Sequence, residues 1–225
     1  MAQIIHLFSR VAMLLMVAGP ASAATLDVLM RQADGSPVSD AVVTLQGPVG
    51  APTGLLKADM DQRGQIFAPH VLAVHTGTLV RFPNSDNIRH QVYSFSAAKR
   101  FELRLYEGTP SDPLLFDKPG VVVLGCNIHD WMLGYIYVTD DPRFGVTDAQ
   151  GRLRFEQLPP GDYHATLWHP QLADMQPLDG GTLHVPAAGL SHSAVLALQS
   201  VSADTPPAPS AFGDAFNRAA HETAQ

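Results

Sequence analysis

The 225-residue sequence contains a single cysteine, Cys126. One thiol cannot close a disulfide within the chain, and it cannot supply the paired cysteines of a zinc knuckle or an iron–sulfur cluster. Basic residues are also few, because 14 lysines and arginines stand against 21 acidic residues, giving a formal net charge of -7. This balance argues against a basic phosphate-binding surface, so we expect no nucleic acid as a partner.

Long apolar runs are missing as well. The apolar segment 11–18 follows Arg10 and precedes the small residues Ala21 and Ala23, as in a secretory signal peptide. It is far shorter than the ~20 residues that a membrane span requires, and no later segment is longer. We therefore expect residues 1–23 to be a signal peptide cleaved after Ala23, and the mature chain to be a soluble periplasmic protein without a membrane span.

The sequence before residue 205 has no long apolar period of 3.6 residues, which argues against a helical protein. Short segments rich in β-branched and aromatic residues alternate instead with turns containing Gly, Pro, Asn and Asp. We therefore expect an all-β sandwich, and residues 199–225 as a flexible tail. The predicted strands are 25–30, 41–46, 71–74, 78–82, 90–95, 101–105, 120–125, 133–138, 153–155 and 165–168.

One group of residues has the composition of a metal site. Cys126, His129 and Met132 lie three residues apart in a loop between the two clearest strands, and His90 begins a strand farther upstream. Two histidines and a cysteine with a weak axial methionine form the ligand set of a blue-copper electron-transfer site. The sequence therefore predicts one mononuclear type 1 copper site with these four residues as its ligands.

Other interpretations of these residues are weaker. Buried core Cys and Met with incidental histidines would explain each residue alone, but not this spacing. Zinc could use the same donors, although a thioether is a poor zinc ligand. Trp131, inside the same loop, either presents an aromatic face for electron entry or partner docking, or packs beside the copper. We expect His70 at the surface rather than in the site, and surface positions for four other histidines: His164, His169, His184 and His192.

Residues 58–140 resemble the cupredoxins, the blue copper proteins that include plastocyanin and amicyanin. The short Cys-x2-His-x2-Met loop is most similar to amicyanin, and the segment 82–95 resembles the plastocyanin-like proteins named for methylamine utilisation. The resemblance implies a Greek-key β-sandwich with copper at one end and His129 as the electron portal. The residues that carry it are Phe67-Ala-Pro69, Val71-x-x-Val74-x-x-Gly77-Thr-x-Val-x-Phe82-x-Asn84, His90 and Cys126-x2-His129-x2-Met132.

The chain departs from the cupredoxin pattern at three positions. Many members of the family carry Asn where this chain has Gln91, Ser or Thr where it has Asn127, and Pro where it has Ile128. We therefore expect the hydrogen bonds and the stiffness of the copper loop to differ from those of the family.

A second resemblance lies outside the copper segment. Residues 145–167 resemble carboxypeptidase-regulatory-like modules, with Thr-Asp-x-x-Gly-x-x-x-Phe followed by Leu-Pro-Pro-Gly-x-Tyr. Such modules open with two strands around Asp-Gly-x-Pro, a pattern that this chain has at 26–46. We hypothesise a split β-sandwich module formed by 25–48 and 143–198, with the cupredoxin domain, 49–142, inserted in one of its loops. In the alternative, the N-terminal strand pair belongs to the cupredoxin sheet.

These observations predict a periplasmic protein that carries single electrons between redox partner proteins by Cu(I)/Cu(II) cycling. The sequence indicates no oligomeric state. A copper-handling protein, either chaperone or store, is the alternative; it would need exchangeable exposed donors and would favour Met-rich or His-rich tracts, which this sequence lacks. We do not expect an enzyme, because one one-electron centre with four ligands has little capacity for multi-electron chemistry.

Overall fold

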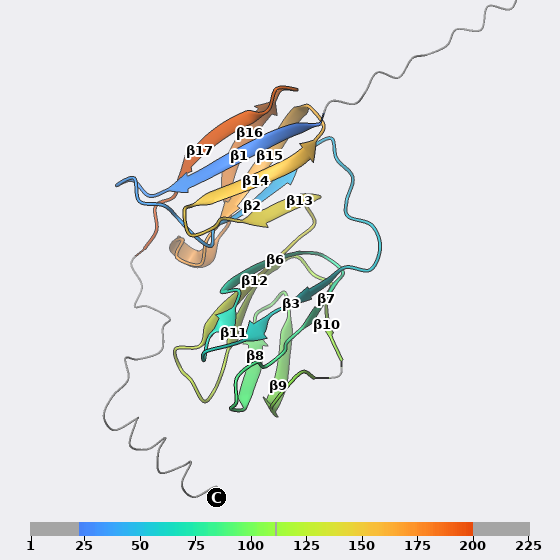
Figure 1. Ribbon diagram of the computed structural model, residues 1–225, viewed down its shortest axis with the longest axis vertical. Coiled ribbons are helices and arrows are strands. Elements are labelled where there is room, and N and C mark those ends of the chain that lie inside the picture. Colours follow the sequence, from blue (N-terminus) through green and yellow to red (C-terminus); the bar gives the residue numbers. More distant parts are fainter. Residues whose placement is uncertain (1–22, 111, 200–225) are drawn as a thin grey trace, which may run out of the picture.

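The computed structural model describes residues 23–110 and 112–199. The predicted signal peptide and tail lie outside these residues, apart from Ala23 and Gln199. Within the described residues every element is a β-strand except the 3-10 helix η1, Ala173–Met175, which confirms the predicted all-β class. The strands form two groups, one above the other (Figure 1). No helix in the described ranges is long and apolar enough to cross a membrane.

The central unit, residues 57–139, is the lower group in Figure 1. Its larger sheet has the order β6-β12-β11-β8-β9, its smaller sheet has the order β10-β7-β3, and β4 pairs with β5 in a short ribbon. The bounds are β3 Lys57–Asp59, β4 Asp61–Gln62, β5 Phe67–Ala68, β6 Val71–His75, β7 Thr78–Arg81, β8 His90–Phe95, β9 Arg100–Tyr106, β10 Leu114–Phe116, β11 Gly120–Gly125 and β12 Leu133–Thr139.

The flanking unit, residues 24–46 and 143–195, is the upper group in Figure 1. Strand β1 lies between β14 and β17, and β2 lies between β13 and β15, with β16 at the edge beyond β15. N-terminal strands therefore pair with C-terminal ones, and the central unit interrupts this unit in sequence. The bounds are β1 Ala24–Arg31, β2 Val42–Gln46, β13 Arg143–Val146, β14 Arg152–Leu158, β15 Gly161–Trp168, β16 Leu178–Val185 and β17 Leu190–Val195.

The hairpin of β11 and β12 lies inside the larger sheet of the central unit, between β6 and β8. Its sequences, GVVVLG and LGYIYVT, are rich in the β-branched and aromatic residues that favour strands. The two strands pair antiparallel from Gly120 opposite Val138 to Gly125 opposite Leu133. Residues 126–132 are therefore the loop that closes this hairpin, and the strand register fixes both of its ends.

Strand β12 is buried on both faces and separates two hydrophobic cores. Ile136 and Val138 belong to the core of the central unit, whereas Tyr135 and Tyr137 belong to the core of the flanking unit. Both tyrosine rings contact the fully buried Trp168, with ring centroids 5.9 and 5.4 Å apart. Because aromatic side chains bury large apolar areas, this contact gives the two units a continuous apolar boundary.

Several strands were not predicted from the sequence. The short strands β3, β4 and β5 lie in or beside the Gly- and Pro-punctuated region after residue 48, where local propensity is weak. Strand β16 contains Gly180 and Gly181, which weaken a strand signal because glycine has no side chain to pack. Strand β17 pairs parallel with β1, more than 150 residues earlier in the chain, so its partner is invisible to a local pattern.

Candidate metal centre

Two neighbouring strands bring the predicted ligands to one end of the central unit. Cys126 directly follows β11, and His90 is the first residue of β8, the strand next to β11 in the sheet. Gly125 pairs with Tyr93 of β8, and a Cβ atom on Gly125 would lie 2.7 Å from the tyrosine ring. Glycine thus permits the close approach of the two strands just before the cysteine.

His90, Cys126 and His129 converge on one point. One donor atom from each residue lies within 4.8 Å of the others. The Cys126 Sγ lies 3.9 Å from His90 Nδ1, and the two imidazole rings have centroids 5.0 Å apart. His90 is fully buried and Cys126 is 3% exposed, so the donors face one another inside the protein rather than solvent.

Met132 closes the loop and belongs to the same buried core as Cys126. Its backbone N–H donates to the His129 carbonyl over 2.9 Å, which folds the second half of the loop into a turn. The side chain is 1% exposed. The loop therefore carries a thiol, an imidazole and a thioether, of which the thiol and the thioether are buried.

His129 has a nitrogen available for a ligand. Its Nδ1 is buried and has no hydrogen-bond partner among the described residues. Burial, assisted by repulsion from His90 and opposed by the charge of Asp86, lowers the pKa of His129 below 6.5. The ring is therefore neutral at neutral pH, which is the form that binds a metal.

Asp86 orients His90, and sequence reasoning missed it. Its carboxylate accepts a hydrogen bond from His90 Nε2 over 2.8 Å, leaving His90 Nδ1 to face the thiol. The backbone N–H groups of Gly64 and Gln65 donate to the same carboxylate. Burial alone would raise the pKa of Asp86, but these hydrogen bonds and the nearby His90 outweigh it and lower the pKa. The sequence carries no signal for this role, because Asp86 lies in a loop before β8 and its backbone partners are more than 20 residues away.

Asn84 and Tyr106 stabilise the loop and the strands around His90 at this end of the central unit. The Asn84 side chain donates to the carbonyls of Ile88 and Tyr106 and accepts from the Asp86 N–H, which fixes the loop before His90. Tyr106 lies opposite His90 on β9 and bonds through its hydroxyl to Gln62 and to the Phe82 carbonyl. Burial raises the pKa of Tyr106 to about 12, so this neighbour of the site stays neutral.

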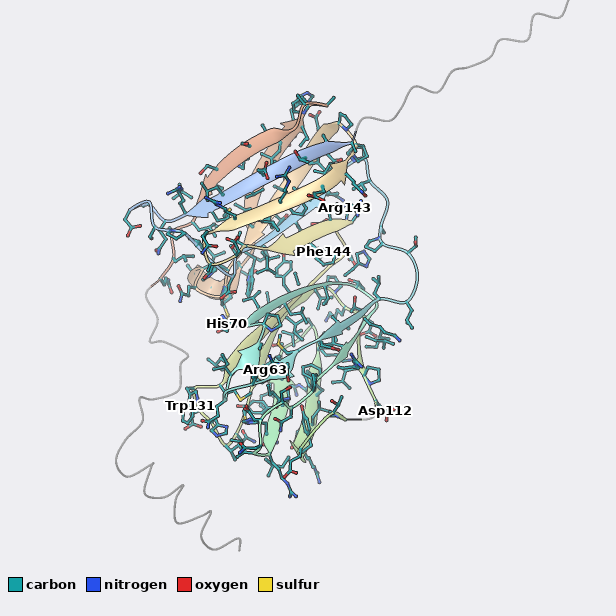
Figure 2. The ribbon with its side chains drawn as sticks, in the orientation of Figure 1. Arg63, His70, Asp112, Trp131, Arg143 and Phe144 are labelled. Carbon is teal, nitrogen blue, oxygen red and sulfur yellow. The ribbon has the colours of Figure 1, made fainter. Side chains whose placement is uncertain are left out.

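His70 does not join the three converging donors. Its Nδ1 lies 3.1 Å from Asp40 Oδ2, and its ring contacts Tyr135 edge-on. Figure 2 places His70 at the boundary between the two units, above Trp131. The side chain is about one-third exposed, so the expected surface position is only partly correct.

Three histidines of the flanking unit have partners without a metal. His164 and His184 lie at the surface, close to Asp179 and Asp162 respectively. The expected surface position of His169 is wrong, because this residue is 6% exposed. Its Nε2 contacts the Ser39 carbonyl and its Nδ1 accepts from the Gln171 N–H, so both ring nitrogens have partners.

The three converging donors fit a metal ion of the copper type. With metal–ligand bonds of about 2.0–2.3 Å, a sulfur and a nitrogen on one metal lie about 3.6–3.8 Å apart, close to the observed 3.9 Å. The unpaired Nδ1 of His129 gives a second indication, because buried polar atoms normally have partners. A soft thiolate beside two imidazoles matches copper or zinc, and the buried thioether of Met132 favours copper.

Searches against known proteins gave matches only among solved structures. No family model and no curated protein matches the chain. A Cu-containing nitrite reductase from Thermus scotoductus SA-01 is 28% identical over 42% of this chain and 25% of its own length, with a TM-score of 0.36. This chain therefore spans about a quarter of that protein.

Two smaller copper proteins also match. A purple cupredoxin from Nitrosopumilus maritimus is 21% identical over 36% of this chain and 99% of its own length, with a TM-score of 0.33. A mutant of amicyanin in the Cu(I) state is 19% identical over 37% of this chain and 82% of its own length, also at 0.33. Each of these three matches leaves more than half of this chain unaligned.

Proposed function

We propose that this protein binds one copper ion through His90, Cys126, His129 and Met132 and carries single electrons. The observation that carries the proposal is the convergence of a buried thiol and two imidazoles within 4.8 Å, with one imidazole nitrogen left without a partner. When bound, copper supplies one-electron chemistry between Cu(I) and Cu(II). The chain supplies a fixed set of donors, so that the oxidation state changes with little rearrangement.

The rigidity of the donors supports electron transfer. His90 is held by Asp86, whose carboxylate is itself held by two backbone N–H groups. Cys126 and Met132 are held at the two ends of a hairpin loop whose register is set by β11 and β12. Such support limits the movement of the donors, and outer hydrogen bonds of this kind also tune metal sites.

Burial favours an electron carrier over a copper chaperone or store. A protein that hands over copper needs donors that a partner can reach, whereas Cys126 and Met132 are 3% and 1% exposed. His129 is the only one of the four that is half-buried rather than buried. It is therefore our proposed electron portal, and we do not assign an enzymatic reaction to the site.

We also propose that the chain is exported and built from two domains. The segment 11–18 and the residues after it support a periplasmic location, where the carrier would meet redox partner proteins. The pairing of β2 with β15, and of β1 with β14, supports a split module of 25–48 and 143–198 around a cupredoxin domain of 49–142. This module is proposed to be carboxypeptidase-regulatory-like.

Copper loading tests the proposed function. We expect Cu(II) to bind with one ion per chain, to give an intense thiolate-to-copper band in the visible spectrum, and to cycle reversibly in voltammetry. Cys126→Ser should lose the band, while His164→Gln, at an exposed histidine of the flanking unit, should keep it. Weak, readily chelated copper without the band would contradict electron transfer and favour copper handling.

A further inference from the structure

Trp131 contacts the outer ligand of the proposed copper site. Its ring centroid lies 5.1 Å from that of His129, at an interplanar angle of 52°. The His129 ring also contacts that of His90, with centroids 5.0 Å apart. The three rings therefore form a continuous series that runs outward from the buried donors to a half-buried indole. Figure 2 shows Trp131 at the margin of the central unit.

No hydrogen bond among the described residues explains why residue 131 is tryptophan rather than phenylalanine. Its Nε1 is buried and has no hydrogen-bond partner among the described residues. An unpaired buried donor is unfavourable, and a buried Trp N–H usually finds a partner. By contrast, the Nε1 of the core residue Trp168 donates to the Met175 carbonyl over 3.0 Å.

The ligand loop presents the apolar side chains of Ile128 and Trp131 beside the exposed polar residues Asn127 and Asp130. Ile128, on the other side of His129 in the sequence, is 49% exposed. Asp130 is the one charged residue among residues 126–132. A partner that approaches His129 therefore meets an aliphatic and an aromatic side chain next to a single carboxylate, that of Asp130.

We propose that Trp131 is the residue through which electrons pass between His129 and a docked redox protein with an apolar contact surface. This inference rests on the proposed function. Bound copper would supply the Cu(II)/Cu(I) couple, and one electron lost by the reduced centre of the partner would reach it through the indole and the His129 imidazole. No bond forms or breaks, no proton moves, and the indole itself is not oxidised.

Electron self-exchange tests this role, with a second copy of the chain as the redox partner. The rate between Cu(I) and Cu(II) forms is measured by NMR line broadening in the full-length wild type, Trp131→Phe and Trp131→Leu. We expect Trp131→Leu to exchange an order of magnitude more slowly and Trp131→Phe to keep most of the rate. Phe95→Leu is the control, because this aromatic residue is 71% exposed at the opposite end of β8 from His90.

A readout independent of exchange is tryptophan fluorescence. The chain has two tryptophans, and the fully buried Trp168 remains as the single emitter in Trp131→Phe. The difference from wild type therefore isolates the emission of Trp131. We expect copper loading to quench that emission strongly, because the indole touches a ligand ring. Unquenched Trp131 emission would overturn the proposal.

The possible failures are distinguishable. If the wild type gives no thiolate-to-copper band, the proposed function fails. If the band and the reduction potential are normal in wild type and Trp131→Leu, and both exchange at the same rate, only the role of Trp131 fails. If Trp131→Leu loses the band, Trp131 supports the site structurally, and unquenched Trp131 emission in the copper-loaded wild type would then overturn the relay.

Discussion

His169 is buried and His129 is half-buried, and their ring nitrogens have opposite surroundings. In the flanking unit, both nitrogens of His169 have backbone partners at Ser39 and Gln171. In the central unit, His129 Nδ1 is buried without a partner, and the residue lies in a group of donors that contains a thiol. A satisfied imidazole stabilises the fold, whereas an imidazole with an unused lone pair in a cluster of donors indicates a ligand.

The strongest way to break this comparison is to remove each histidine in turn. His129→Ala should abolish tight copper binding while leaving the stability of the copper-free protein almost unchanged. His169→Ala should keep copper binding and lower the free energy of unfolding by about 2–4 kcal/mol, because it leaves backbone groups unpaired and opens a cavity. Copper titration and urea unfolding of the copper-free variants measure both effects. Equal effects of the two substitutions on copper binding would contradict the account.

Trp168→Ala tests whether the hydrophobic cores of the flanking unit and the central unit are independent. Trp168 is fully buried and contacts Tyr135 and Tyr137 of β12 from the flanking side. Truncation of a buried Trp costs about 3–5 kcal/mol, so we expect a large loss of stability in urea unfolding. The thiolate-to-copper band should persist at low temperature, because the copper ligands lie in the other core. Loss of the band from a folded variant would show that the two cores are coupled.

Asp86→Asn tests the support of His90. The amide keeps the size of the side chain but removes the charge that fixes the His90 tautomer. Loss of such an outer partner typically lowers metal affinity about 10–100-fold, and we expect a decrease in that range in competition titrations. Asp130→Asn, at the exposed carboxylate of the ligand loop, is the control and should bind as wild type does. A copper affinity of Asp86→Asn equal to that of the wild type would show that Asp86 does not support the metal site.

The smallest expected effect is a pH dependence from His169. Burial, with repulsion from His70, lowers the pKa of His169, and the Ser39 carbonyl and Asp40 oppose this only in part. Below pH 6.5 the unfolded chain therefore takes up a proton that the folded protein resists. Stability should be fully present above pH 6.5 and fall as the pH drops towards the lowered pKa. Urea unfolding of copper-free protein should show a steeper loss in wild type than in His169→Gln; parallel slopes would contradict this.

The sequence was most informative where the relevant residues are close together. The spacing of Cys126, His129 and Met132 within one loop is visible without a fold, and the adjoining valine-rich and tyrosine-rich strands form as predicted. The start of a predicted strand at His90 indicated a fourth donor. The structure brings His90, Cys126 and His129 together, with Met132 in the core beside them.

The missed features depend on contacts between distant segments. Asp86 looks like an ordinary loop carboxylate until the turn at Gly64 and Gln65 is packed against it. The burial of His169 depends on the carbonyl of Ser39, 130 residues away. The ring contact between Trp131 and His129 depends on how the loop closes, which the spacing of residues does not determine.

X-ray absorption at the copper edge of the loaded protein tests the central claim most directly. The account predicts one short copper–sulfur bond from Cys126 and two nitrogen ligands from His90 and His129, with the sulfur contribution lost in Cys126→Ser. A shell of nitrogen and oxygen donors alone in the wild type, unchanged by Cys126→Ser, would contradict it.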